Sequence, residues 1–149
     1  MNSLAAPVTA AGANRTTSLV LVVEDEPDLL MMFRRALLRS GFDVATATNG
    51  REGLAAASEL RPDVIVLDIV MPGESGFRVC QLLRRSEATR ATPVLLLSAA
   101  PTDTNVAQGR QSGATGFLAK PLSPAMLAEH VRAMLDHAVR PFSLAPGLG

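Results

Sequence analysis

Several polar side chains in this sequence follow directly after short apolar runs, at positions where a buried strand would end. The segment PDVIVLDIVMPGESG shows the pattern most clearly, because four apolar residues precede Asp68 while a proline and a glycine follow soon after it. An apolar strand does not need a carboxylate at its tip, so we expect Asp68 to belong to a site. The full set contains three carboxylates, a hydroxyl and an ammonium group: Glu24, Asp25, Asp68, Ser98 and Lys120.

The chemistry open to this set is phosphoryl transfer assisted by a divalent cation. Carboxylates about 4 Å apart repel by several kcal/mol at an intermediate dielectric, and raised pKa values or a hard cation relieve that repulsion. Mg²⁺ prefers a few carboxylates together with waters and a phosphate. A carboxylate beside Mg²⁺ and a lysine is a plausible nucleophile toward phosphorus, which would form an aspartyl phosphate. Lys120 and the Ser98 hydroxyl could then hold phosphoryl oxygens.

Lys120 stands out because it is the only lysine in the chain, whose other basic residues are all arginine. This exception indicates that a compact point charge is needed at this position. The alternative, a surface lysine without function, fits less well with its place before Pro121 at the end of an expected strand.

Strand and helix patterns alternate from Leu19 onward, which predicts five βα units and a parallel sheet covered by helices on both faces. Pro27 suits the first turn of the first helix, and Ser123 suits the cap of the last one. In an open sheet of this kind, sites form outside the carboxyl ends of the strands, where the polar set would meet. We expect strands at 19–23, 42–47, 64–68, 93–99 and 114–120, and helices at 26–41, 49–60, 74–87, 102–113 and 123–139.

Composition limits the remaining classes. The chain has 149 residues, 48% of them hydrophobic, and its 14 basic residues balance 14 acidic ones, so no overall charge favours nucleic acid or a membrane surface. A single cysteine, Cys80, excludes an internal disulfide and fits the cytoplasm. No apolar run approaches the length of a membrane span, and the first residues do not resemble a signal peptide. We expect a disordered extension at 1–18, one domain at 19–139 and a flexible tail at 140–149.

Four motifs in order, VVEDEP, VIVLDIVMPGESG, LLLSA and GATGFLAKP, resemble the receiver domain of two-component response regulators. The resemblance covers about 120 residues, from Leu19 to Val139, and implies a flavodoxin-like doubly wound sheet of five strands in the order 2-1-3-4-5. By resemblance, Asp68 is the phosphoacceptor and Mg²⁺ is the cofactor, with Asp25, Asp68 and the Val70 backbone carbonyl as ligands. Glu24 would complete the metal pocket through water, Ser98 and Lys120 would hold the phosphoryl group, and Phe117 takes the aromatic switch position.

The resemblance also implies how long the phosphorylated state lasts. In receivers, the side chains two residues after the phosphoacceptor and two after the Ser/Thr flank the path of the hydrolytic water, and here they are Val70 and Ala100. Neither side chain can hydrogen-bond a water, so we expect slow self-dephosphorylation and a long-lived aspartyl phosphate. At the switch position, Phe117 replaces the more common tyrosine, so its rotation would depend on packing without a hydroxyl bond.

As a receiver, the chain would be a signalling protein and not an enzyme. Its partners would be a histidine kinase or phosphotransfer protein and a downstream protein target, without direct contact to nucleic acid or membrane. The output surface would be the fourth helix, fifth strand and fifth helix, and a phosphorylation-dependent dimer is left open. The few residues after Val139 cannot fold alone, so we expect a stand-alone receiver unless the chain is part of a longer product.

Two other functional classes compete with this interpretation. A degenerate receiver would act only as a binding module, but the intact Asp68, Asp25 and Lys120 argue against it. A phosphatase or phosphotransferase of the haloacid dehalogenase type would need a second aspartate at position 70, where this chain has valine. Outside the site, we expect Arg84 and Arg85 to be solvated and Cys80 to fill the core beside Phe77 and Leu83.

Overall fold

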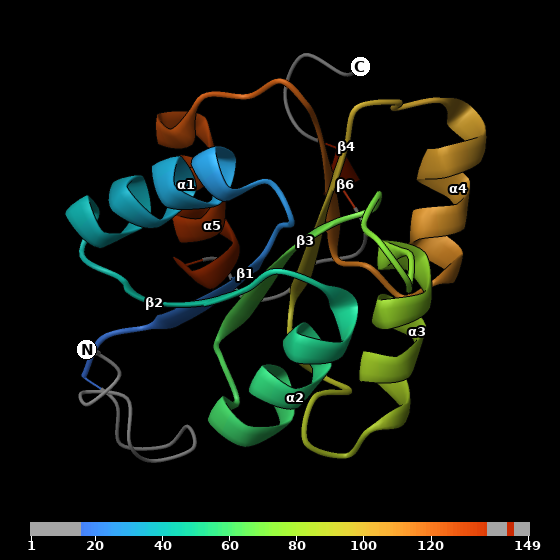
Figure 1. Ribbon diagram of the computed structural model, residues 1–149, viewed down its shortest axis with the longest axis horizontal. Helices are drawn as coiled ribbons and strands as arrows, with labels where there is room; N and C mark the ends of the chain where they lie inside the picture. The colour runs from blue at the N-terminus through green and yellow to red at the C-terminus, as the bar shows by residue number, and fades with distance from the viewer. Residues whose placement is uncertain (1–15, 137–142, 145–149) are drawn as a thin grey trace.

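The computed structural model describes residues 16–136 and 143–144, and it has a single sheet between two layers of helices (Figure 1). The sequence predicted all ten main elements, and their observed bounds lie within a few residues of the predicted ones. The strands are β1 Leu19–Val23, β2 Asp43–Ala47, β3 Val64–Asp68, β4 Val94–Ser98 and β5 Gly116–Ala119. The helices are α1 Pro27–Arg39, α2 Gly50–Leu60, α3 Gly76–Arg85, α4 Asp103–Gln111 and α5 Pro124–Asp136.

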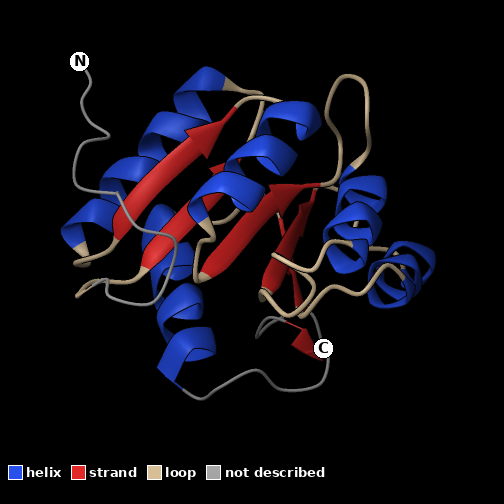
Figure 2. Ribbon diagram, turned by 90° about the horizontal axis from the view of Figure 1, so that it is seen from below, coloured by secondary structure: helices blue, strands red, loops and turns tan. Residues whose placement is uncertain are grey.

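The strand order β2-β1-β3-β4-β5 confirms the predicted doubly wound topology, and all neighbouring strands are parallel (Figure 2). A sixth strand, β6 Ser143–Leu144, pairs in parallel with the outer edge of β5 and was not predicted. The predicted extension 1–18 and tail 140–149 otherwise lie mostly outside the described residues.

Two apolar cores hold the layers together because side chains alternate between the faces of a strand. Leu21 and Val23 of β1 face the core under α2, α3 and α4, which also contains Cys80. Val20 and Val22 face the core under α1 and α5, where Phe33 and Leu37 of α1 pack. Strands β1, β3 and β4 are buried on both faces, which explains why they form nearly continuous apolar runs in the sequence.

Helices α2 to α5 begin at side-chain caps that also set where the loops end, whereas α1 has no side-chain cap. The hydroxyl of Ser123 accepts a hydrogen bond from the backbone N–H of Met126, as the sequence predicted. Asn49, Ser75 and Thr102 cap α2, α3 and α4 in the same way. Pro27 occupies the first turn of α1, where its missing N–H has no intrahelical partner to lose. The caps therefore fix the helix starts beside the carboxyl ends of the strands.

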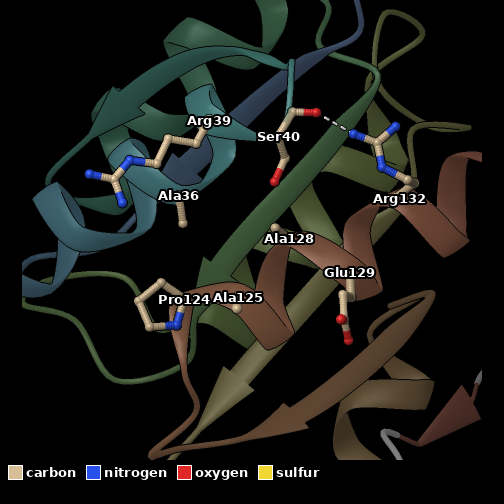
Figure 3. Close-up of a pocket in the computed structure, with 8 residues that line it drawn as sticks. All are labelled: Ala36, Arg39, Ser40, Pro124, Ala125, Ala128, Glu129 and Arg132. Atoms are coloured by element: carbon tan, nitrogen blue, oxygen red, sulfur yellow. Dashed lines mark hydrogen bonds between the residues drawn. The ribbon is translucent and has the colours of Figure 1, made fainter.

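Helices α1 and α5 lie side by side on one face and leave a groove of about 440 Å³ between them (Figure 3). Its floor is built from small side chains such as Ala36, Ala125 and Ala128. Arg132 lies at one end, where it donates to the backbone carbonyl of Ser40 and stacks over the ring of Phe42 at 4.7 Å.

The expectation that Arg84 is solvated is wrong. Its guanidinium is half-buried and donates to three backbone carbonyls, those of Gly113 at 2.9 Å, Thr89 at 3.2 Å and Thr92 at 2.7 Å. It therefore ties the end of α3 to the loop before β4 and to the turn before β5. Its neighbour Arg85 is exposed, as expected. Among the described residues, no helix is long and apolar enough to cross a membrane.

Candidate functional site

Strand register brings the predicted site residues to one edge of the sheet. Val23 pairs with Leu67, so Glu24 and Asp68 both lie one step further along their strands. Asp68 pairs in turn with Leu97, the residue before Ser98. Ser98 pairs with Ala119, the residue before Lys120, so the ends of β3, β4 and β5 lie at the same edge. The backbone N–H of Lys120 also donates to the Ser98 carbonyl at 2.7 Å. The convergence that the sequence predicted from four separate strand ends is therefore present in the fold.

Three carboxylates form an acidic cluster at this edge. Glu24 is only 1% exposed and Asp68 only 4%, whereas Asp25 is exposed. One carboxylate oxygen from each lies within 4.8 Å of the others. Burial and the neighbouring Asp68 raise the pKa of Glu24 to about 7. Burial is the larger of these two causes, and the negative charge of Asp68 adds to it. Oε2 of Glu24 accepts the backbone N–H of Glu26, and this bond acts in the opposite direction by lowering the pKa.

The ammonium group of Lys120 joins two of these carboxylates. Nζ lies 3.2 Å from Oδ2 of Asp68 and 3.3 Å from Oε1 of Glu24. Burial alone would lower the pKa of Lys120, but the two carboxylates outweigh that effect and raise it. The lysine therefore stays charged beside Asp68, which is the state needed to hold an anionic group there.

The hydroxyl of Ser98 is the fourth member of the site. Ser98 is buried, and its Oγ accepts the backbone N–H of Ala100 at 3.0 Å. A serine hydroxyl that accepts one hydrogen bond still has its single O–H to donate. Ser98 can therefore bind an oxygen that arrives beside Asp68 without losing its bond to Ala100.

Phe117 lies below the site on β5 and is fully buried. It packs in the core under α2, α3 and α4 together with Leu96. A Cβ added to Gly109 of α4 would lie 3.2 Å from both Phe117 and Leu96, so the glycine lets α4 approach the ring closely. The ring at the predicted switch position thus contacts both the sheet and α4.

A family model described as the response regulator receiver domain matches residues 20–132. This chain belongs to the response regulator receiver domain family. Receiver domains are signalling modules with a phosphorylatable aspartate, and they interact with histidine kinases or phosphotransfer proteins. They bind Mg²⁺ at an acidic pocket, and this receiver has such a cluster in Glu24, Asp25 and Asp68.

Named relatives and solved structures agree with this family. The transcriptional regulatory protein AfsQ1 of Streptomyces coelicolor is 38% identical over 121 residues, which cover 81% of this chain and 52% of that protein. The DNA-binding response regulator MtrA of Mycolicibacterium smegmatis is 40% identical over 116 residues, covering 78% and 50%. This receiver domain thus spans about half the length of these relatives. The chemotaxis response regulator CheY4 of Vibrio cholerae superposes with a TM-score of 0.77 at 35% identity, over 80% of this chain and 100% of that chain.

The two residues predicted to flank the path of the hydrolytic water, Val70 and Ala100, are both exposed. Val70 is 74% exposed, and its N–H donates to Oδ1 of Asp68 at a long 3.4 Å, so its peptide lies beside the carboxylates. Its carbonyl as a metal ligand stays a prediction. Ala100 is also exposed, on the neighbouring loop. Neither side chain carries a polar atom, and their backbones contact two different residues of the site, Asp68 for Val70 and Ser98 for Ala100.

The sequence interpretation missed Gly76, the first residue of α3. A Cβ at this position would lie 2.5 Å from the Asp68 carbonyl oxygen and 2.7 Å from the Ile69 Cα. Only glycine lets the start of α3 approach this backbone, and its N–H donates to the Ile69 carbonyl at 2.8 Å. The sequence gives no distinctive signal for this role, since helix α2 also begins with a glycine, Gly50. Gly76 therefore helps to fix the loop that comes after Asp68 in this receiver domain.

Proposed function

We propose that this receiver domain accepts a phosphoryl group on Asp68 from a histidine kinase or histidine phosphotransfer protein. The observation that carries the proposal is the position of Asp68, which is buried, in contact with Lys120 at 3.2 Å and beside two further carboxylates. A carboxylate in a purely structural ion pair would not need the two additional acids, because they weaken the pair by repulsion. The arrangement fits a nucleophile that meets an anionic group.

The residues of the cluster also fit Mg²⁺. We propose Asp25, Asp68 and the Val70 backbone carbonyl as direct ligands, with Glu24 acting through water. When bound, Mg²⁺ would neutralise part of the charge on the phosphoryl oxygens. The geometry of the cluster supports this assignment, since three carboxylates lie together and Lys120 contributes a single positive charge beside them.

The chain's own groups would perform the transfer. An oxygen of the Asp68 carboxylate forms a bond to phosphorus while the P–N bond of the donor phosphohistidine breaks. Lys120 holds one phosphoryl oxygen by its positive charge, and the Ser98 hydroxyl donates to another. The backbone N–H groups of the loop after Asp68 complete the set of donors.

The proposed output is the surface of α4, β5 and α5, read by a downstream protein target. Phe117 lies on β5, and α4 rests on its ring through Gly109, so a movement of the ring changes this surface. The relatives whose names describe DNA binding or transcriptional regulation are about twice as long as the matched region. We propose that residues 19–139 themselves act in the cytoplasm on protein partners, without contacting nucleic acid or membrane.

A direct experiment uses a small phosphodonor such as acetyl phosphate. Wild-type protein incubated with the donor and Mg²⁺ should gain the mass of one phosphate, and omission of Mg²⁺ should abolish the gain. The variant Asp68→Asn should show no gain because an amide is not a nucleophile toward phosphorus here. The proposal would be wrong if Asp68→Asn were phosphorylated as fully as wild type.

A further inference from the structure

We infer that Asn105, in the first turn of α4, is a positioning residue that couples Ser98 to α4. The inference rests on the proposed function, because the coupling acts once a phosphoryl group has reached Ser98. The residues involved form a hydrogen-bonded path on the loop between β4 and α4, and this path is separate from the packing of Phe117.

Ala100 is the centre of this path because its peptide groups are bound on both sides. Its N–H donates to Oγ of Ser98 at 3.0 Å. Its carbonyl accepts the side-chain amide of Asn105 at 2.8 Å and the backbone N–H of Thr102 at 2.8 Å. The hydroxyl of Ser98 and the first turn of α4 are therefore separated by a single residue and two hydrogen bonds.

Asn105 is itself held in place within the helix start. Its backbone N–H donates to Oγ1 of Thr102, the residue that caps α4. Asn105 is thus fixed through its backbone to the cap and through its side chain to Ala100. A displacement of Ala100 would carry the cap and the first turn of α4 with it, because all three are joined by hydrogen bonds.

Helix α4 is an element that such a path could move. Gly109 is its only buried residue, whereas α3 buries five, so few apolar contacts hold α4 on the domain. Elements with few buried contacts have low local stability and are those that shift most readily. Phe117 touches α4 but has no hydroxyl, so it cannot form a polar link between the loop and the helix. Among the described residues, the hydrogen bonds around Ala100 are the polar connection from the site to α4.

The direction of coupling can be derived from the chemistry of Ser98. Its Oγ accepts from Ala100 while its O–H remains available for a phosphoryl oxygen. If Ser98 moves toward that oxygen, the N–H of Ala100 follows its acceptor. The carbonyl of Ala100 then moves with the same residue, and Asn105 transmits this movement to α4. A ligand that binds one arrangement of Ser98 and α4 better shifts the population toward that arrangement. Through this path, a phosphoryl group at Ser98 would change the position of α4.

The test compares backbone amide shifts in NMR spectra with and without beryllofluoride and Mg²⁺. Asn105→Asp keeps the shape of the side chain and suits a helix start, but it cannot donate to the Ala100 carbonyl. Asn105→Ala removes the side chain. Thr104→Ala is the matched control, because Thr104 is an exposed neighbour in the same turn. Urea denaturation of each variant reports whether the fold is intact.

In wild type and Thr104→Ala, beryllofluoride should shift amides both around Asp68 and along residues 103–111. In both Asn105 variants, the shifts around Asp68 should remain while those along 103–111 fall several-fold. Shifts along 103–111 of wild-type size in folded Asn105→Asp and Asn105→Ala would overturn the inference. If wild type shows no shifts around Asp68, the proposed function itself fails and the coupling falls with it.

Discussion

Replacing Arg84 by methionine should destabilise the domain far more than the same change at its neighbour Arg85. Arg84 donates to the carbonyls of Gly113, Thr89 and Thr92 at 2.7 to 3.2 Å, while Arg85 is exposed. Methionine keeps much of the apolar stem but offers no donor, so the carbonyls of Gly113 and Thr92 lose the guanidinium and that of Thr89 keeps only the backbone N–H of Thr92.

The magnitude can be worked from these three bonds. A hydrogen bond to a charged group contributes about 1.5–3 kcal/mol. The three do not add fully, because the guanidinium is half-buried and water can reach part of the vacated space. We therefore expect Arg84→Met to lower the free energy of unfolding by about 2–4 kcal/mol, and Arg85→Met to change it by less than about 0.5 kcal/mol.

Urea denaturation measures this difference. With a slope of about 2 kcal/mol per molar urea, the midpoint for Arg84→Met should fall by about 1–2 M relative to wild type. Arg84→Lys should recover only part of the loss, because one ammonium group cannot reach three carbonyls in the geometry of a guanidinium fork. If the midpoints of Arg84→Met and Arg85→Met agree within error, the three bonds do not stabilise the fold and the reasoning is wrong.

Three further changes test the site. Gly76→Ala should destabilise the domain by about 1–3 kcal/mol and slow phosphorylation, because its Cβ would lie 2.5 Å from the Asp68 carbonyl; unchanged urea midpoint and rate would contradict this. Val70→Asn should lose phosphate faster than wild type in excess Mg²⁺, because the amide can hold the hydrolytic water; an equal decay rate would show that this side chain does not set the lifetime. Lys120→Arg should impair phosphorylation or the beryllofluoride-induced shifts although the charge is kept, since a planar fork replaces a compact ammonium group; wild-type behaviour in both assays would refute the point-charge argument.

The central strands β1, β3 and β4 were predictable because they are buried on both faces. Leu19–Val23 and Val64–Asp68 match the predicted strands because continuous burial produces uninterrupted apolar runs in the sequence. Helices α1, α3 and α4 were predicted two residues too long at their C-terminal ends, and the predicted N-terminal ends included the cap residues. Strand β6 has two residues and leaves no pattern that a sequence can show.

The residues of the site were predictable, but the residues that hold the neighbouring loops in place were not. Parallel strands must end at a common edge, so the convergence of Asp68, Ser98 and Lys120 could be derived from topology alone. Arg84 was misjudged because its partners come from loops that are up to 29 positions away in the sequence. Its spacing contained a hint, since Arg84 lies four residues after the buried Cys80 and so borders the buried face of α3.

The groove between α1 and α5 also falls outside the sequence prediction. The small residues that line the groove have no distinctive pattern in the sequence, and only the packing of the two helices reveals the space between them (Figure 3).

The central claim is that Asp68, and neither of the acids beside it, carries the phosphoryl group. Borohydride reduces an acyl phosphate to an alcohol, so it converts a phosphorylated aspartate into homoserine at that position of the chain. Wild-type protein treated with acetyl phosphate and Mg²⁺, then reduced and digested, should yield homoserine at position 68 by peptide mass spectrometry. Reduction at Glu24 or Asp25 instead, or no reduced residue in protein that has gained the mass of one phosphate, would contradict the account.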